Sequence, residues 1–205
     1  MAVNVRGAVP STIVPMNSIA ILAGYLAGSV PFAFLLARRA GIDVRRVGSR
    51  NVGAANVLRN TGVGRALLVT LLDVAKGAAP VGLALASTGG NGVAALTGAA
   101  AIVGHIYPVW LRFHGGKGVA VAAGVFAVLT PIATAIAMTL FLVIVSATRY
   151  VSLGSVAATL ALPPAAWVTG APGVVVAASA GTAALILFRH RANLSRLTHG
   201  TERRL

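Results

Sequence analysis

Seven apolar runs dominate this sequence and constrain its fold more than any other feature. They cover approximately residues 18–37, 65–86, 93–111, 118–130, 132–147, 153–168 and 173–188. A helix needs about 20 mostly apolar residues to cross the roughly 30 Å of hydrocarbon in a bilayer. Because 57% of the 205 residues are hydrophobic and only 10% are charged, there is no room for a separate soluble domain. We therefore predict an all-α integral membrane protein.

The fourth and fifth runs are ambiguous, because residues 118–147 are long for one helix and short for two. Thr130 and Pro131 lie at the centre of this stretch, where proline ends or kinks a helix. Short cytoplasmic loops collect Lys and Arg, and only two separate helices bring the basic segments, 38–65, 112–117, 149 and 189–205, to one side. We therefore predict seven transmembrane helices, with the amino terminus outside and the carboxyl terminus in the cytosol.

The charge balance is strongly basic, with 17 Lys and Arg residues against three acidic ones. In a soluble protein this balance would suggest a nucleic-acid partner, but here the basic residues lie between apolar runs, and we expect none. The absence of cysteine excludes disulfides, thiolate nucleophiles and thiolate metal sites. The first apolar run ends at Arg38 and Arg39 and is longer than a signal-peptide core, so we expect a retained span.

The first polar segment, residues 48–59, mixes small residues with amide side chains and arginine. Glycines such as Gly53 let backbone amides approach an anion, and Arg59 can grip one with two parallel hydrogen bonds. An ordinary positive-inside loop would explain the arginines, but not the additional Asn51 and Asn56. We interpret the segment, which also contains Ser49, as a candidate anion site.

The second polar segment runs from residues 104–108 to 113–118 and contains a lysine between glycines. Lys117 precedes a predicted span, so its ammonium and the amides that begin the next helix point the same way, as a phosphate site requires. The pattern is not a nucleotide-binding P-loop. The earlier glycine is missing at the required spacing, and Gly118 stands where Ser or Thr would bind magnesium.

Two further polar segments lie in the carboxyl-terminal half. His190 and Asn193 are three residues apart and share one side of a helical turn. Residues 152–155 supply two serine hydroxyls and join the site only if the fold brings them there. Asp73 and Lys76, also three apart, fall inside the second run, where mutual pairing competes with direct contact to a substrate as the explanation.

The residues that are missing narrow the chemistry. Asp43, Asp73 and Glu202 are the only acids in the sequence, so a serine triad has few candidates for its orienting acid. The four histidines are scattered, and we expect no metal and no cofactor. The His-x4-Asp motif of common glycerolipid acyltransferases is also absent. A site of Arg, Lys, His, Asn and Ser should bind phosphate groups at a membrane surface.

Taken in order, segments 48–59, 73–77, 104–120, 152–155 and 190–202 resemble the bacterial acyl-phosphate:glycerol-3-phosphate acyltransferase family, PlsY. The resemblance implies seven spans in the bacterial inner membrane and an active site on the cytosolic face. It implies transfer of a fatty acyl chain from acyl phosphate to the 1-hydroxyl of glycerol 3-phosphate, giving lysophosphatidic acid and phosphate without acyl-CoA. The implied partners are these substrates, membrane lipids and other enzymes of phospholipid synthesis.

Carried over position by position, the resemblance implies two sets of site residues. The catalytic set is Ser49, Arg59, Lys117, Ser155, His190 and Asn193, and the substrate-binding set is Asn51, Gly53, Asn56, His105, Gly115, Gly116 and Gly118. Two positions depart from the family pattern: Ala55 replaces an expected Thr and Arg50 a common Gly. Residues 1–17 have no match, so we predict an amino-terminal extension followed by one membrane domain, residues 18–205.

Acyl phosphate is a mixed anhydride with a good leaving group, so holding two substrates together and stabilising charge could supply most of the rate. The resemblance suggests that a substrate phosphate accepts the hydroxyl proton, with His190 as the alternative base. Two other functions stay open. A transporter or flippase for phosphorylated metabolites would place polar residues along the spans, where only Asp73 and Lys76 qualify. A catalytically dead scaffold would have lost part of the polar set, which is complete.

Overall fold

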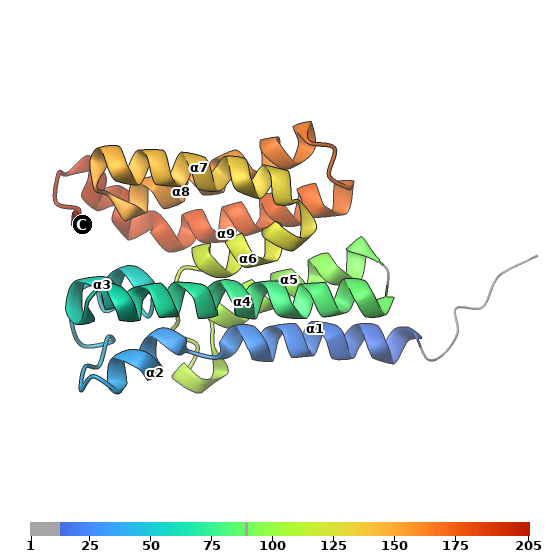
Figure 1. Cartoon of the computed structure of the whole chain (residues 1–205), viewed down its shortest axis with the longest axis horizontal. Helices are drawn as coiled ribbons and strands as arrows, with labels where there is room; N and C mark the ends of the chain where they lie inside the picture. Colours follow the sequence, from blue (N-terminus) through green and yellow to red (C-terminus); the bar gives the residue numbers. More distant parts are fainter. Residues whose placement is uncertain (1–12, 89) are drawn as a thin grey trace, which may run out of the picture.

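The computed structural model describes residues 13–88 and 90–205, and every regular element within them is a helix (Figure 1). In chain order the elements are α1 (Ile13–Ser29), α2 (Phe32–Arg38), α3 (Ala54–Thr61), α4 (Val63–Thr88), α5 (Asn91–Ile106), η1 (Val109–Leu111), α6 (Val119–Leu129), α7 (Pro131–Thr148), α8 (Val151–Val168) and α9 (Gly173–Thr198). The all-α prediction is confirmed. The predicted extension, residues 1–17, lies mostly outside the described residues, and α1 already includes residues 13–17.

Six stretches of the described residues are long and apolar enough to cross a membrane. They are Met16–Arg38, Val63–Thr88, Asn91–Leu111, Pro131–Thr148, Val151–Val168 and Gly173–Thr198. Large apolar side chains on their outer faces are exposed, among them Leu71, Leu83 and Leu142. Exposure on this scale suits contact with lipid rather than water.

The fourth predicted span differs from the others. Its boundary lies where the sequence placed it, since α6 ends at Leu129 and α7 begins at Pro131. With 11 residues, however, α6 is only about 16 Å long, roughly half the hydrocarbon core. In Figure 1 the chain between α5 and α6 turns back near the middle of the long axis rather than at an end. The count of seven spans and the orientation of the termini therefore stay predictions.

Small residues let the helices approach closely. A Cβ on Gly28 would collide with the backbone of Ala101, so α1 and α5 pack almost backbone to backbone. Gly124 of α6 lies in the same way against the backbone of Val74 in α4. Such contacts stabilise helix pairs in lipid, where hydrophobicity gives little driving force between helices. They seat α6 in the bundle interior and thereby position the segment that precedes it.

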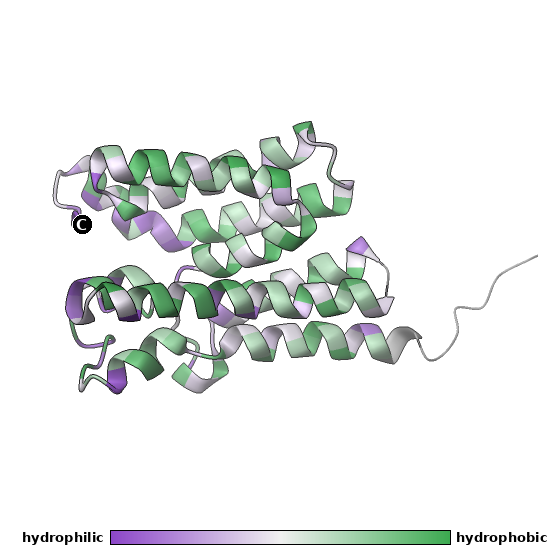
Figure 2. Ribbon diagram, viewed as in Figure 1, coloured by the Kyte–Doolittle hydropathy of each residue, from purple (hydrophilic) through white to green (hydrophobic). Residues whose placement is uncertain are grey.

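Hydrophilic residues gather mainly at one end of the bundle, where α2, α3, the start of α4 and the carboxyl terminus lie (Figure 2). A buried apolar cluster that includes Ile102, Phe126 and Ile186 contains residues from each of the helices α4 through α9. A smaller cluster around Val57 and Val69 holds α2, α3 and α4 together. The predicted polar segments lie beside these clusters. The fold therefore brings residues from distant parts of the sequence to one end of the molecule.

Candidate active site

The loop before α3 is built around one amide side chain. Asn56 is 1% exposed, and its Nδ2 donates to the carbonyl oxygens of Val44, Val47 and Asn51 at 2.9, 3.2 and 3.1 Å. Its Oδ1 accepts from the backbone N–H of Ser49 at 3.0 Å. Asn56 therefore shapes the loop and has no spare donor for a ligand.

Arg50, one of the two departures from the family pattern, has a φ of 58°. This left-handed conformation favours glycine, so the common glycine has a backbone reason and arginine here costs about 1–2 kcal/mol. Ala55, the other departure, lies in the first turn of α3, and the N-cap residue of this helix, Gly53, offers no side-chain cap. The arginine adds local backbone strain, while the side chain of Asn56 keeps the loop closed.

The glycines around Lys117 are required by close packing. The N–H groups of Gly115 and Gly116 donate to the carbonyl oxygens of Ile106 and His105, both at 3.1 Å. A Cβ on Gly116 would collide with the His105 ring and lie 2.8 Å from the carbonyl oxygen of Val52. Gly118 has a φ of +93°, which an L side chain rarely adopts. The turn is thus fixed against both α5 and the loop before α3.

Lys117 begins a chain of hydrogen bonds that ends on an acid. Its Nζ donates to Oδ1 of Asn193, whose Nδ2 donates to Oε1 of Glu202 at 2.6 Å. Glu202 also accepts from Ser152 Oγ at 3.0 Å and from Arg196 Nε at 2.7 Å. Desolvation raises the pKa of Glu202, but these donors outweigh it and leave the pKa below its ordinary value. The network joins α6, α8, α9 and the carboxyl-terminal tail.

This network contains residues that the sequence prediction did not select. Glu202 was noted only as one of three acids and as the end of the last motif, and Ser152 only as a neighbour of Ser155. Ser155 instead donates to the carbonyl oxygen of Val151 at 2.8 Å, within its own helix. The hydroxyl that contacts the network is therefore Ser152, one turn earlier on α8.

His190 is 2% exposed, and its Nδ1 lies 2.9 Å from the carbonyl oxygen of Ile186. A carbonyl only accepts, so Nδ1 carries the proton and Nε2 is left as an acceptor. This tautomer suits either a general base or an acceptor of a substrate hydroxyl.

Asp73 and Lys76 form a buried ion pair of 2.7 Å, and Lys76 Nζ also donates to the carbonyl oxygen of Val30 at 2.7 Å. The predicted mutual pairing is confirmed. The Nδ1 of His105 lies 3.8 Å from Asp73, and the same ring packs under Gly116. His105 therefore packs against both the ion pair and the glycine turn. Lys76 ties the ion pair to the break between α1 and α2.

Two arginines flank the lysine. Arg59 on α3 donates from Nη2 to the carbonyl oxygen of Arg203 at 3.1 Å, and burial holds its pKa below the ordinary value. Arg189 on α9 donates from Nη2 to the carbonyl oxygen of Gly116 at 3.3 Å. In both side chains Nε is buried and has no hydrogen-bond partner among the described residues. Each guanidinium therefore keeps donor capacity for a ligand.

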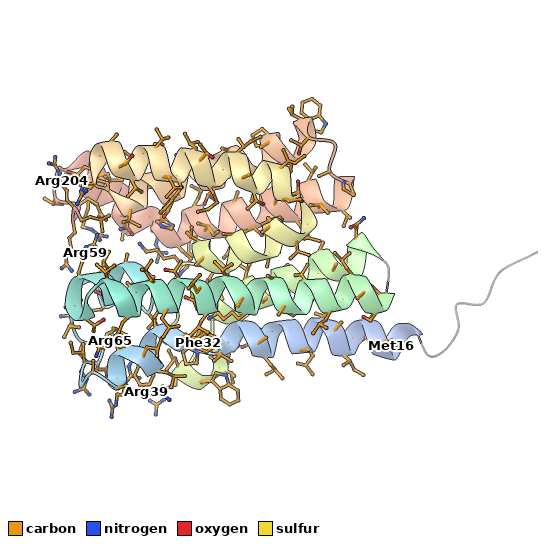
Figure 3. The ribbon with its side chains drawn as sticks, in the orientation of Figure 1. Met16, Phe32, Arg39, Arg59, Arg65 and Arg204 are labelled. Atoms are coloured by element: carbon orange, nitrogen blue, oxygen red, sulfur yellow. The ribbon has the colours of Figure 1, made fainter. Side chains whose placement is uncertain are left out.

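The carboxyl-terminal tail closes one side of the site. Figure 3 places Arg59 and Arg204 at the same end of the bundle. Arg204 Nε donates to the Tyr150 hydroxyl at 3.0 Å, and the N–H of Leu205 donates to the carbonyl oxygen of Arg149 at 2.9 Å. The tail therefore connects α3 to the turn between α7 and α8.

An apolar pocket opens beside the polar network, between α6, α7, α8 and α9. Its lining includes Val119, Phe126, Met138, Leu162, Thr182 and Ile186. Val119 follows Lys117 by two residues, and Ile186 precedes His190 by one helical turn. A ligand with an apolar tail in this pocket would therefore carry its polar end to Lys117. Across residues 13–88 and 90–205 no group of three His, Asp or Glu side chains that could hold a metal ion is found.

Comparison with known proteins agrees with this geometry. The family model for glycerol-3-phosphate acyltransferase matches residues 18–200. A glycerol-3-phosphate acyltransferase from Synechococcus is 46% identical over 193 residues, covering 93% of this chain and 96% of the relative. One from Rubrobacter xylanophilus is 45% identical over 184 residues, covering 90% of this chain and 92% of the relative.

Two crystal structures of PlsY, described as an integral membrane glycerol 3-phosphate acyltransferase, have the same fold. The glycerol 3-phosphate form superposes with a TM-score of 0.90 at 40% identity, covering 93% of this chain and 96% of that one. The lysophosphatidic acid form gives 0.88 at 39% identity, covering 93% and 95%. The chain belongs to the PlsY family of integral membrane glycerol-3-phosphate acyltransferases.

Proposed function

We propose that this chain transfers a fatty acyl group from acyl phosphate to the 1-hydroxyl of glycerol 3-phosphate, releasing lysophosphatidic acid and phosphate. The observation that carries the proposal is the apolar pocket whose lining residues Val119 and Ile186 lie two residues from Lys117 and one helical turn from His190, in a donor-rich cluster. A donor with a hydrocarbon tail and a charged head fits this combination. The relatives named above support glycerol 3-phosphate as acceptor.

The chemistry needs no covalent enzyme intermediate. The acceptor oxygen attacks the acyl carbonyl carbon, the bond from that carbon to the phosphate oxygen breaks, and its electron pair leaves with the phosphate. The hydroxyl proton goes to a phosphate oxygen of a substrate or to Nε2 of His190, which the bond at Nδ1 leaves as an acceptor. Lys117 and Arg59 stabilise charge, and the network through Asn193 holds Lys117 in place.

His190→Asn distinguishes the two proton acceptors. A general base contributes about 100- to 10,000-fold to a rate. A fall of that size, with unchanged KM for both substrates, would assign the proton to His190. A fall below about 10-fold would assign it to a substrate phosphate.

The donor is tested directly with purified protein. Incubation with acyl phosphate and labelled glycerol 3-phosphate should give labelled lysophosphatidic acid, whereas acyl-CoA should give none. Product from acyl-CoA alone would overturn the donor assignment. Activity should survive a chelator, because Lys117 and Arg59 supply the positive charge that a metal would otherwise provide.

We also propose that the site faces the cytosol of a bacterial inner membrane, with the amino terminus outside. The basic residues near α2, α3 and the carboxyl terminus support this orientation (Figure 2). The chain has no cysteine, so single cysteines at positions 50 and 195 can be labelled without background. A reagent confined to the outside of intact cells should label neither position, and labelling of either one contradicts the orientation.

The transporter alternative has no support from the spans. Asp73 and Lys76, the charged residues that it would need, are already paired with each other. Lys76 also donates to the carbonyl oxygen of Val30, so both charges are compensated within the protein.

A further inference from the structure

The proposed reaction brings together two substrates that each carry a phosphate, and so it needs two anion subsites. The predicted site supplied two cations, Arg59 and Lys117. Arg189 of α9 is a third: it donates to the carbonyl oxygen of Gly116, next to Lys117, and like Arg59 it acts electrostatically on Lys117. Its role in the site was not predicted, because an arginine at the end of an apolar helix is normally explained by topology.

The surroundings of Arg189 leave it free to bind an anion. Its Nη2 donates to the carbonyl oxygen of Gly116 at 3.3 Å, and its guanidinium carbon lies 5.6 Å from the centre of the Tyr107 ring. These contacts fix the orientation of the Arg189 guanidinium and leave most of its five N–H donors unused. Nε is buried without a hydrogen-bond partner in the described part of the chain, and among the described residues no acid forms an ion pair with Arg189. A half-buried guanidinium with unused donors is suited to phosphate.

The position of Arg189 relative to the apolar pocket distinguishes the two substrates. Ile186 lines the pocket, and Arg189 lies three residues further along the same face of α9. Val119 of α6 also lines the pocket, and Lys117 and Gly116 lie two and three residues before it on the chain. The polar end of the pocket therefore lies between Arg189 and the glycine turn. Arg59, by contrast, comes from α3, which does not line the pocket.

Of the two substrates, only the donor carries a phosphate and a hydrocarbon tail on one molecule. We infer that Arg189, together with Lys117, binds the phosphate of the acyl donor, and that Arg59 binds the phosphate of glycerol 3-phosphate. The inference rests on the proposed function and divides its site into two subsites that share Lys117. Burial lowers the pKa of Lys117, and repulsion from Arg196, Arg189 and Arg59 lowers it further, so both proposed phosphate-binding arginines act on this lysine.

The test compares the KM for each substrate in two variants. Arg189→Gln should raise the KM for acyl phosphate about 10-fold or more, the loss expected for a charge-assisted contact, and leave the KM for glycerol 3-phosphate within about twofold. Arg59→Gln should show the reverse pattern. Released phosphate should inhibit the wild type competitively against acyl phosphate, and more weakly in Arg189→Gln. The matched control is Arg191→Gln, because Arg191 is exposed on the same helix and stacks on Phe188 at 4.3 Å; both KM values should stay unchanged.

The outcomes separate the inference from the function on which it rests. A wild type that is inactive with acyl phosphate refutes the function. An active wild type overturns the inference if Arg189→Gln changes neither KM, or if it raises both KM values equally, as a merely structural bond to Gly116 would. If Arg189→Gln does not fold, Arg189→Lys keeps the charge and loses the fork. It should then raise only the KM for the donor, and an unchanged donor KM would refute the subsite.

Discussion

The two lysines of this molecule, Lys76 buried and Lys117 half-buried, differ in how their charge is compensated. Lys76, inside α4, lies 2.7 Å from Asp73 and 2.7 Å from the carbonyl oxygen of Val30. Lys117, before α6, has no carboxylate within ion-pair distance among the described residues, and its Nζ reaches Asn193. The nearest acid of its network, Glu202, lies beyond that amide. The charge of Lys76 is balanced by a carboxylate within the fold, whereas Lys117 is held in position by an amide and has no direct acid partner.

The comparison suggests a physical criterion for separating structural from functional charges. Removing a lysine from water is costly, and a direct acid partner offsets the cost permanently. A lysine bonded only to an amide has no negative charge beside it. A phosphate that binds there can therefore form the ion pair that the protein itself does not supply. On this criterion we propose that the Asp73–Lys76 pair stabilises the bundle and that Lys117 binds substrate.

The largest expected effect comes from Lys117→Met. The substitution removes a charge that the fold does not need, so protein yield should stay normal while turnover falls about 100- to 1,000-fold. Lysophosphatidic acid formation per milligram of purified protein measures it. Arg65→Met is the control, because Arg65 is an exposed arginine near the same end. Turnover of Lys117→Met within threefold of the wild type would remove Lys117 from the site.

Lys76→Met should have the opposite profile. It leaves Asp73 buried without its cation, at a cost of about 3–5 kcal/mol, so the amount of folded protein should fall. The double variant Asp73→Asn with Lys76→Met removes both charges and should recover most of that loss. Thermal unfolding in detergent measures both. A double variant no more stable than Lys76→Met would mean that the Val30 contact, not the ion pair, carries the stability.

Much of this arrangement could be predicted from the sequence. Hydropathy predicted the all-α class and Pro131 the start of α7, because both depend on local properties of the chain. The length of α6 could not be predicted, since apolar composition does not show that the chain turns back in the middle of the bundle. The pairing of Asp73 with Lys76 was predicted because spacing of three on a helix fixes proximity.

The site was less predictable, because hydrogen-bond partners depend on the fold. The side chain of Asn56 donates to backbone carbonyl oxygens of its own loop. Ser152 rather than Ser155 contacts Glu202. The rotation of α8 and the return of the tail decide these contacts, and neither has a local signature. For Glu202 a signal did exist, since it ends the last motif, and an acid in a strongly basic chain needs partners.

Arg59→Lys sharpens the comparison on the arginine side. Lysine keeps the charge but loses the planar fork, so turnover should fall by about 10-fold or more, equivalent to about 1.4 kcal/mol. Arg65→Lys, at an exposed arginine that bonds the carbonyl oxygen of Thr61, should be neutral. Turnover is measured after confirming equal membrane insertion. Equal, near-wild-type rates for the two would mean that Arg59 serves only topology.

The smallest expected effect is a pH dependence that follows from the under-compensated charge of Lys117. Burial lowers the pKa of Lys117 to about 8, helped by repulsion from Arg196, Arg189 and Arg59, and together these effects outweigh the attraction of Glu202. If the protonated form binds phosphate, binding is strongest well below pH 8, is half lost near that value and weakens further as the pH rises. Because the free enzyme is titrated, kcat/KM should fall, by about 10-fold per unit well above the pKa.

The same titration links Lys117 to its network. Glu202→Gln keeps the shape of the acceptor but removes the charge that favours protonated Lys117. The pKa of Lys117 should therefore fall further, and the decline in kcat/KM should begin at lower pH than in the wild type. A profile that is flat to pH 10 in the wild type, or identical in Glu202→Gln, would show that Lys117 holds its charge independently of Glu202, and the contrast with Lys76 would then rest on geometry alone.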